Sequence, residues 1–128
     1  MTPIDVSARS QIPRSAMVDK LEMARAIRTA AVSAAFEAVP RELFVPEIAA
    51  RDGLDAGYEP ASALITARDE RGTLISSSSA PSIMAPMQEQ LELREGLRVL
   101  EVGAGTGDGH EGWPKGSRYL SRKNCSRN

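Results

Sequence analysis

The chain has 128 residues, a length that fits one domain but not a complete doubly wound α/β enzyme. Hydrophobic residues make up 41% and charged residues 26% of it, which is ordinary for a globular chain. The formal net charge of −1 leaves no basic footprint for nucleic acid or an anionic membrane. No apolar run is long enough to span a bilayer.

The single cysteine, Cys125, excludes an internal disulfide and a cysteine-based zinc site. The first twenty residues contain five charged side chains and therefore lack the apolar core of a signal peptide. We expect a cytoplasmic protein without a metal site. Neither Cys125 nor the single histidine, His110, falls in a catalytic or ligand pattern.

Residues 1–13 lack periodicity and contain two prolines, so we expect a flexible N-terminal arm. From Arg14 the apolar residues recur at helical spacing, and a second helix is predicted after Thr29, which can cap it. Pro40 ends that second helix because proline has no N–H to donate. The residues predicted to face the core are Met17, Leu21, Ala24, Ile27, Val32, Phe36 and Val39.

Prolines and glycines interrupt residues 40–62, which predicts a loop with one short helical turn. Two β-prone runs follow, at residues 63–67 and 73–76. The charged link between them ends in Gly72, so the whole segment is typical of a hairpin.

A run of four serines, residues 76–79, precedes a predicted helix that reaches about Glu92. Pro81 suits the first turn of this helix. Pro86 would either kink the helix or move its start downstream. By itself the serine run is typical of a polar turn that caps the helix.

The apolar run at residues 97–102 predicts a strand that leads directly into Gly-Ala-Gly-Thr-Gly. Alternating glycines permit a sharp turn and let a ligand approach the main chain, as in nucleotide-type loops after the first strand of an α/β sheet. A carboxylate beside such a loop favours a cationic ligand, S-adenosylmethionine, over NAD; a plain flexible loop is the alternative. The predicted cofactor-binding residues are Glu101, Gly103, Ala104, Gly105 and Gly107.

Composition changes at residue 108: acidic residues predominate before it and basic residues after it. Residues 108–116 contain too many glycines for a helix, and residues 117–128 show no strand pattern. The second acidic residue expected about 20 positions after the loop, to hold the ribose hydroxyls, is missing. We expect a disordered tail over 108–128, produced by a frameshift or premature stop, and a strand 97–102 without the neighbours that a parallel sheet needs.

Residues 38–46, AVPRELFVP, resemble the AVPRE-x-FVP signature of the protein-L-isoaspartate O-methyltransferase family. The order also matches, with a helical pair before the signature, a serine-then-proline segment after it, and VLEVGAGTG at the end. The correspondence covers residues 14–107. The serine-rich segment at 75–85 looks closer to an actinobacterial branch, some members of which modify ribosomally made peptides.

The resemblance implies an α/β fold, namely the N-terminal helical arm, first strand and glycine loop of a class I, Rossmann-like methyltransferase. It also implies methyl transfer from S-adenosylmethionine to the side-chain carboxylate of isoaspartyl residues in damaged proteins or peptides. The family's active-site serine corresponds to Ser79, with Ser78 as the alternative. In the signature, an Arg41–Glu42 ion pair would anchor the linker, while Phe44 and Val45 would pack the helical arm onto the sheet.

Two alternatives stay open. One is an enzyme that methylates an aspartate in a dedicated peptide precursor, which the serine run favours. The other is a non-catalytic fragment acting as an interaction module, which the missing ribose carboxylate favours. No nucleic-acid or membrane partner is expected, and the oligomeric state is left open.

Overall fold

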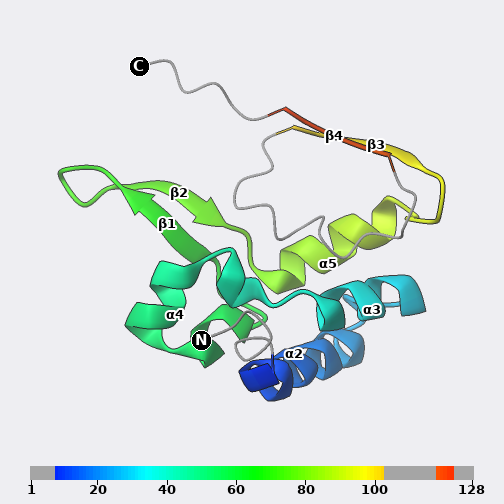
Figure 1. The fold of residues 1–128 in the computed structure, drawn as a ribbon, viewed down its shortest axis with the longest axis horizontal. Helices are drawn as coiled ribbons and strands as arrows, with labels where there is room; N and C mark the ends of the chain where they lie inside the picture. Colours follow the sequence, from blue (N-terminus) through cyan, green and yellow to red (C-terminus); the bar gives the residue numbers. More distant parts are fainter. Residues whose placement is uncertain (1–7, 103–117, 123–128) are drawn as a thin grey trace.

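Three helices form the main body of the protein: α2 (Gln11–Met23), α3 (Ala30–Ala38) and α5 (Pro81–Gln90). The computed structural model describes residues 8–102 and 118–122. Within these residues α2 contacts both α3 and α5, and α3 also contacts α5 (Figure 1). The helical pair predicted at the start of the chain is therefore packed against a helix about 50 residues further on.

Helix α2 begins at Gln11, three residues earlier than the periodicity predicts. Pro13 lies in its first turn, where the missing N–H removes no intrahelical bond. The predicted arm at residues 1–13 is wrong at residues 8–9, which are helical, and at residues 11–13, which belong to α2. Residues 1–7 lie outside the described part of the chain.

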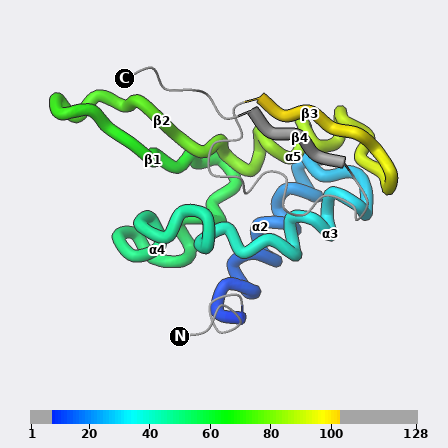
Figure 2. Tube along the Cα trace, turned by 45° about the horizontal axis from the view of Figure 1, so that its top comes forward, coloured from blue at the N-terminus to red at the C-terminus, as the bar shows by residue number. Residues whose placement is uncertain are grey.

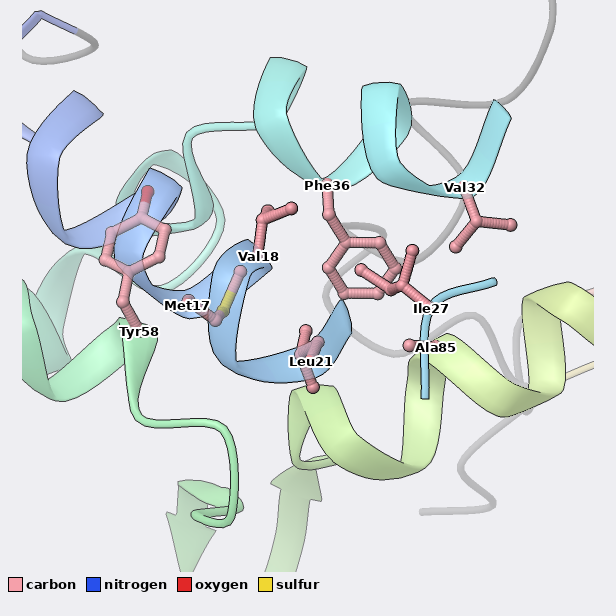
Figure 3. Packing of buried hydrophobic residues seen from close by; sticks show 8 residues of the cluster. All are labelled: Met17, Val18, Leu21, Ile27, Val32, Phe36, Tyr58 and Ala85. Carbon is pink, nitrogen blue, oxygen red and sulfur yellow. The ribbon is translucent and has the colours of Figure 1, made fainter. Parts of the chain in front are cut away.

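Helix α3 has the predicted cap, because the Thr29 side chain accepts a hydrogen bond from the Val32 N–H at 3.4 Å. The predicted helical stripe is confirmed for Met17, Leu21, Ile27, Val32 and Phe36, which form one apolar cluster together with Val18 and with residues from segment 54–58 and α5. The prediction is wrong for Ala24, which is exposed, and Val39 is only half-buried. Figure 3 shows Phe36 pointing from α3 toward Ile27, with Leu21 of α2 and Ala85 of α5 close by. The buried cluster consists of Met17, Val18, Leu21, Ile27, Val32, Phe36, Tyr58 and Ala85.

The segment from 40 to 62 is more helical than predicted. It contains η1 (Arg41–Leu43), α4 (Pro46–Asp52) and η2 (Leu54–Tyr58). Pro46 occupies the first turn of α4, where its fixed φ suits a helix start, and Gly53 ends α4 with φ of +88°. A second buried cluster of Val45, Ile48 and Leu64 joins this segment to the first strand, so Val45 packs on α4 and the hairpin and is not part of the cluster of the helical arm.

The hairpin is confirmed: β1 (Leu64–Arg68) and β2 (Leu74–Ser78) are antiparallel. Each strand begins one residue later than predicted, and β2 ends two residues later. Gly72 adopts φ of +81° in the turn, and Asp69 Oδ1 accepts hydrogen bonds from the N–H groups of Arg71 and Thr73. The hairpin projects away from the helices (Figures 1 and 2), and its second strand leads back toward α5.

Helix α5 begins at Pro81 as predicted and continues past Pro86 to Gln90, so Pro86 does not delay its start. The predicted strand at 97–102 is confirmed as β3 (Arg98–Val102). It pairs in parallel with β4 (Arg118–Arg122), with Arg98 opposite Arg118 and Val102 opposite Arg122. The expectation of a tail without strands is therefore wrong at residues 118–122.

The described residues thus form a mixed α/β structure with two separate two-stranded sheets, β1–β2 and β3–β4. The first sheet is antiparallel and follows the helical segment 40–62, while the second is parallel and follows α5. The serine run spans the junction between the antiparallel sheet and α5.

Candidate functional site

The serine run connects β2 to α5, and its last two residues differ in how far they are exposed to solvent. Ser78 is the final residue of β2 and only 8% exposed, whereas Ser79 is exposed in the extended segment that precedes α5. The Ser78 hydroxyl accepts a hydrogen bond from Arg41 Nη2 at 3.0 Å. Of the two serines, Ser79 is therefore the one whose side chain faces solvent.

Arg41 fixes the main chain at this junction. Its guanidinium is buried, 4% exposed, and Nη2 also donates to the Ser79 carbonyl at 2.8 Å. Nη1 donates to the Gly57 carbonyl at 3.0 Å, and Nη2 lies 3.9 Å from Sδ of Met84 in α5. One side chain of the signature segment thus contacts η2, the end of β2 and α5.

Tyr58 links the same signature segment to the core. Its hydroxyl accepts a hydrogen bond from the Arg41 N–H at 2.9 Å and donates to Glu42 Oε2. Burial raises the pKa of Tyr58 above its usual value, and the hydrogen bond to the Glu42 carboxylate raises it further, while Ser10 and Arg14 act in the opposite direction. Tyr58 is therefore held neutral as a donor to Glu42.

Glu42 is buried among these groups. Its Oε1 atom makes no hydrogen bond within the described part of the chain. The predicted ion pair between Arg41 and Glu42 stays a prediction, because the hydrogen bonds described for the two side chains lead to different partners.

The predicted cofactor residues are placed only in part. Glu101 is half-buried on β3, opposite Ser121 of β4, and lies one residue before the carboxyl end of that strand. Gly103, Ala104, Gly105 and Gly107 lie outside the described residues.

The sequence did not predict the hydrogen bonds of Arg41 that connect the segments around Ser79. The Arg41–Ser79 contact joins residues 38 positions apart, and the Arg41–Tyr58 contact joins residues 17 apart. The only available signal was the presence of an arginine and a tyrosine in segments otherwise rich in apolar and turn residues. Such a signal identifies no partner.

Over 8–102 and 118–122, no group of three or more His, Cys, Asp or Glu side chains could hold a metal ion. No helix in the same part of the structure is long and apolar enough to cross a membrane.

The sequence matches a known protein family over most of its length. The family model described as "Protein-L-isoaspartate(D-aspartate) O-methyltransferase" matches residues 12–111. A protein-L-isoaspartate O-methyltransferase of Methylorubrum extorquens is 46% identical over 94 residues, which cover 73% of this chain and 36% of that relative. One of Methanopyrus kandleri is 40% identical over 94 residues, which cover 73% of this chain and 37% of the relative.

A solved structure shares the fold of this chain. A chain titled protein-L-isoaspartate O-methyltransferase superimposes with a TM-score of 0.63 at 24% identity, over 86% of this chain and 33% of the other. The present chain spans between 34% and 40% of the length of the curated relatives that it matches.

Proposed function

Because this chain belongs to the protein-L-isoaspartate(D-aspartate) O-methyltransferase family, we propose that it transfers a methyl group from S-adenosylmethionine to the side-chain carboxylate of isoaspartyl residues. Residues 14–107 would form the N-terminal part of a class I, Rossmann-like methyltransferase domain, with 108–128 as a tail. The observation that supports the proposal most directly is the buried Arg41 guanidinium, which belongs to the signature and holds the main chain of Ser79.

The residues near the end of β3 suit the cationic cofactor. Glu101 offers a half-buried carboxylate, the right charge for a ligand with a sulfonium and an ammonium group. The loop residues Gly103, Ala104, Gly105 and Gly107 would hold the cofactor through the main chain, which glycine leaves accessible. When bound, S-adenosylmethionine supplies the methyl group in electrophilic form.

Ser79 would orient the acceptor. An isoaspartyl carboxylate with an ordinary pKa near 4 is ionised at neutral pH, so the reaction needs no strong general base. The Ser79 hydroxyl would donate a hydrogen bond to one carboxylate oxygen, which leaves the other oxygen free to accept the methyl group. Ser78 is less suited, since its hydroxyl is buried against Arg41.

The proposal is tested with S-adenosylmethionine labelled in the methyl group, an isoaspartyl peptide and its normal aspartyl isomer. We expect incorporation into the isoaspartyl peptide only, as an ester that releases methanol in alkali. Ser79→Ala should lower this rate about a hundredfold, the cost of losing orientation at the reacting centre. Ser77→Ala, at an exposed position on β2, is the matched control and should leave the rate unchanged.

Two other outcomes of the same assay would contradict parts of the proposal. Methylation of the aspartyl isomer instead would indicate the peptide-specific alternative. Equal rates for wild type and Ser79→Ala would exclude the role of Ser79.

A second candidate function is a non-catalytic interaction module. It is favoured by the exposure of Leu100 and Val102 on β3, the strand that precedes the cofactor loop. Titration calorimetry with S-adenosylmethionine distinguishes the two candidates, because an absence of binding heat together with an absence of methyl incorporation leaves only the module.

A further inference from the structure

Helix α4 ends on the surface of the protein with Arg51 and Asp52. Asp52 is the final residue of the helix, and Gly53 follows it as the C-cap with φ of +88°. The side chains of Arg51 and Asp52 are 66% and 44% exposed. Helix α4 lies at the periphery of the molecule in both views (Figures 1 and 2). The Asp52–Gly53 pair is therefore accessible to solvent.

An aspartate followed by glycine rearranges without an enzyme, because glycine has no Cβ to hinder attack by its own amide nitrogen. The Gly53 nitrogen attacks Cγ of the neutral Asp52 carboxyl, the Cγ–OH bond breaks, and the hydroxyl leaves as water with the proton from nitrogen. The product is a five-membered succinimide. Water then adds to the former main-chain carbonyl carbon of Asp52 and breaks its bond to nitrogen. The chain now continues through Cγ as an isoaspartyl linkage of unchanged composition.

The folded backbone holds the attacking nitrogen through one short helix. The Gly53 N–H donates to the Ala49 carbonyl at 3.0 Å, and this hydrogen bond must break before the ring closes. Helix α4 has seven residues, of which Ile48 is buried, and its last residues are exposed. A helix this short is marginal by itself, so its end opens locally while the apolar core stays folded. Among the described residues beyond its chain neighbours, no heavy atom lies within 4 Å of a Cβ built on Gly53, which leaves room for the ring.

Arg51 acts on the other reactant, the Asp52 carboxyl. Its Nε lies 3.1 and 3.0 Å from the two carboxylate oxygens, and its Nη2 lies 2.8 Å from Oδ2. These hydrogen bonds lower the pKa of Asp52, a small loss of hydration opposes them, and the positive charge of Arg51 lowers the pKa further. An ionised carboxylate is a poor acceptor for the nitrogen, because it has no hydroxyl to release as water. Arg51 therefore slows the rearrangement.

Glycine follows one aspartate within the described ranges 8–102 and 118–122, namely Asp52. The same pair recurs at Asp108–Gly109, outside the described residues. The remaining aspartates in the described part precede residues with side chains, which hinder the attack; they are Asp19 before Lys20, Asp55 before Ala56 and Asp69 before Glu70.

We propose that Asp52–Gly53 is a modification site of this chain, at which an isoaspartyl linkage forms when the end of α4 opens, at a rate that Arg51 limits. The site lies at the start of η2, whose Gly57 carbonyl accepts a hydrogen bond from Arg41. One copy of the chain would then carry the residue that another copy methylates, and only this consequence rests on the proposed function. The linkage itself forms without S-adenosylmethionine.

The test follows the purified chain during incubation at neutral pH without S-adenosylmethionine. A glutamate-specific protease releases residues 48–59, which contain Asp52–Gly53 and Asp55–Ala56 in one peptide. Electron-transfer fragmentation distinguishes isoaspartate from aspartate at each position. We expect isoaspartate to accumulate at Asp52, while Asp55 in the same peptide and Asp69 in the hairpin turn stay unchanged.

Two comparisons test the part played by the folded structure. Arg51→Ala should raise the rate at Asp52 severalfold, whereas Arg71→Ala, at another exposed arginine, should leave it unchanged. In urea that unfolds the chain the wild-type rate should rise, and wild type and Arg51→Ala should converge, because the Gly53 hydrogen bond and the ordered ion pair are both lost.

Three results would overturn the proposal. They are an absence of isoaspartate at Asp52 in the folded chain while a synthetic peptide of residues 48–59 converts, equal conversion at Asp52 and Asp55, and equal rates for folded wild type and Arg51→Ala. Failure of the proposed methyl transfer is distinguishable from these results, because isoaspartate is measured here without any methyl donor.

Discussion

Arg41 contacts three segments that are far apart in the sequence. Its planar guanidinium carries five donors in a fixed geometry, and the described hydrogen bonds reach the main chain of η2 and the end of β2. A buried cation of this kind is tolerated only when its donors are satisfied, so the three acceptors and the arginine depend on one another. The consequence is a defined backbone at Ser79, the residue proposed to orient the substrate.

Arg41→Lys should therefore destabilise the protein although it keeps the charge. A lysine ammonium cannot reach Gly57, Ser78 and Ser79 together, and the carbonyls left unpaired in a buried place cost about 1–3 kcal/mol. Urea unfolding followed by circular dichroism measures the loss.

The control for Arg41→Lys is Arg51→Lys at the exposed Arg51–Asp52 pair, whose side chains are joined at 2.8 Å. A surface pair of this kind contributes little, so we expect a change within about 0.5 kcal/mol. Similar losses for the two variants would contradict the role assigned to Arg41.

At the scale of elements, helix α3 begins on a carboxylate from α5. Glu89 Oε1 accepts hydrogen bonds from the N–H groups of Arg28 and Thr29 at 2.7 and 2.9 Å, and from the Thr29 hydroxyl at 3.1 Å. Burial by itself raises the pKa of Glu89, but the three hydrogen bonds and the nearby Arg28 charge outweigh it, so the pKa lies below its ordinary value. Glu89 in α5 thus acts as a charged cap for the start of α3, and the bonded residues Thr29 and Glu89 are 60 positions apart in the sequence.

Glu89→Gln should lower the free energy of unfolding at pH 7 by about 1.5–3 kcal/mol, the range for hydrogen bonds to a charged group. Because the folded-state pKa is lowered, the stabilisation is present above the unfolded value of 4.5 and is lost as the pH falls through the folded value. Urea unfolding at pH 7 and pH 3.5, on wild type and variant, should show the difference shrink at the lower pH. Glu95→Gln, at an exposed position, is the control, and a difference independent of pH would contradict the capping role.

The short helices between residues 40 and 62 show what local signals cannot predict. Helices of three to seven residues are too short to be stable alone, because nucleation costs more than a few hydrogen bonds return. They form here because Val45 and Ile48 are buried against Leu64 of β1. The hairpin and α5, by contrast, were predicted from Gly72 and Pro81, whose backbone preferences act locally.

For the whole molecule, stability is expected to be uneven between the helical core and the parallel sheet. The core joins α2, α3 and α5 through one buried apolar cluster. Strand β3 pairs only with β4 among the described residues and leaves Leu100 and Val102 exposed. Few buried apolar contacts and an open edge are the features of segments that open locally at low free energy.

Hydrogen exchange measured by mass spectrometry should show this difference directly. Amides of β3 should exchange through local opening, well before those of α2 and α3, which we expect to exchange near the global limit. Protection of β3 equal to that of α2 in the chain alone would contradict this distribution of stability.

Local sequence patterns were enough to predict α2, α3, the hairpin, α5 and β3 to within a few residues, and the family to which the chain belongs. These features depend on signals within a few residues, namely apolar periodicity, a threonine cap, prolines at helix starts and one signature. Three features became visible only in the folded protein: Ser78 is buried while Ser79 is exposed, Arg41 donates a hydrogen bond to the Ser79 carbonyl, and Glu89 caps α3. These contacts join residues 38 and 60 positions apart, and no local pattern specifies a partner across such distances, because packing alone brings the two segments together.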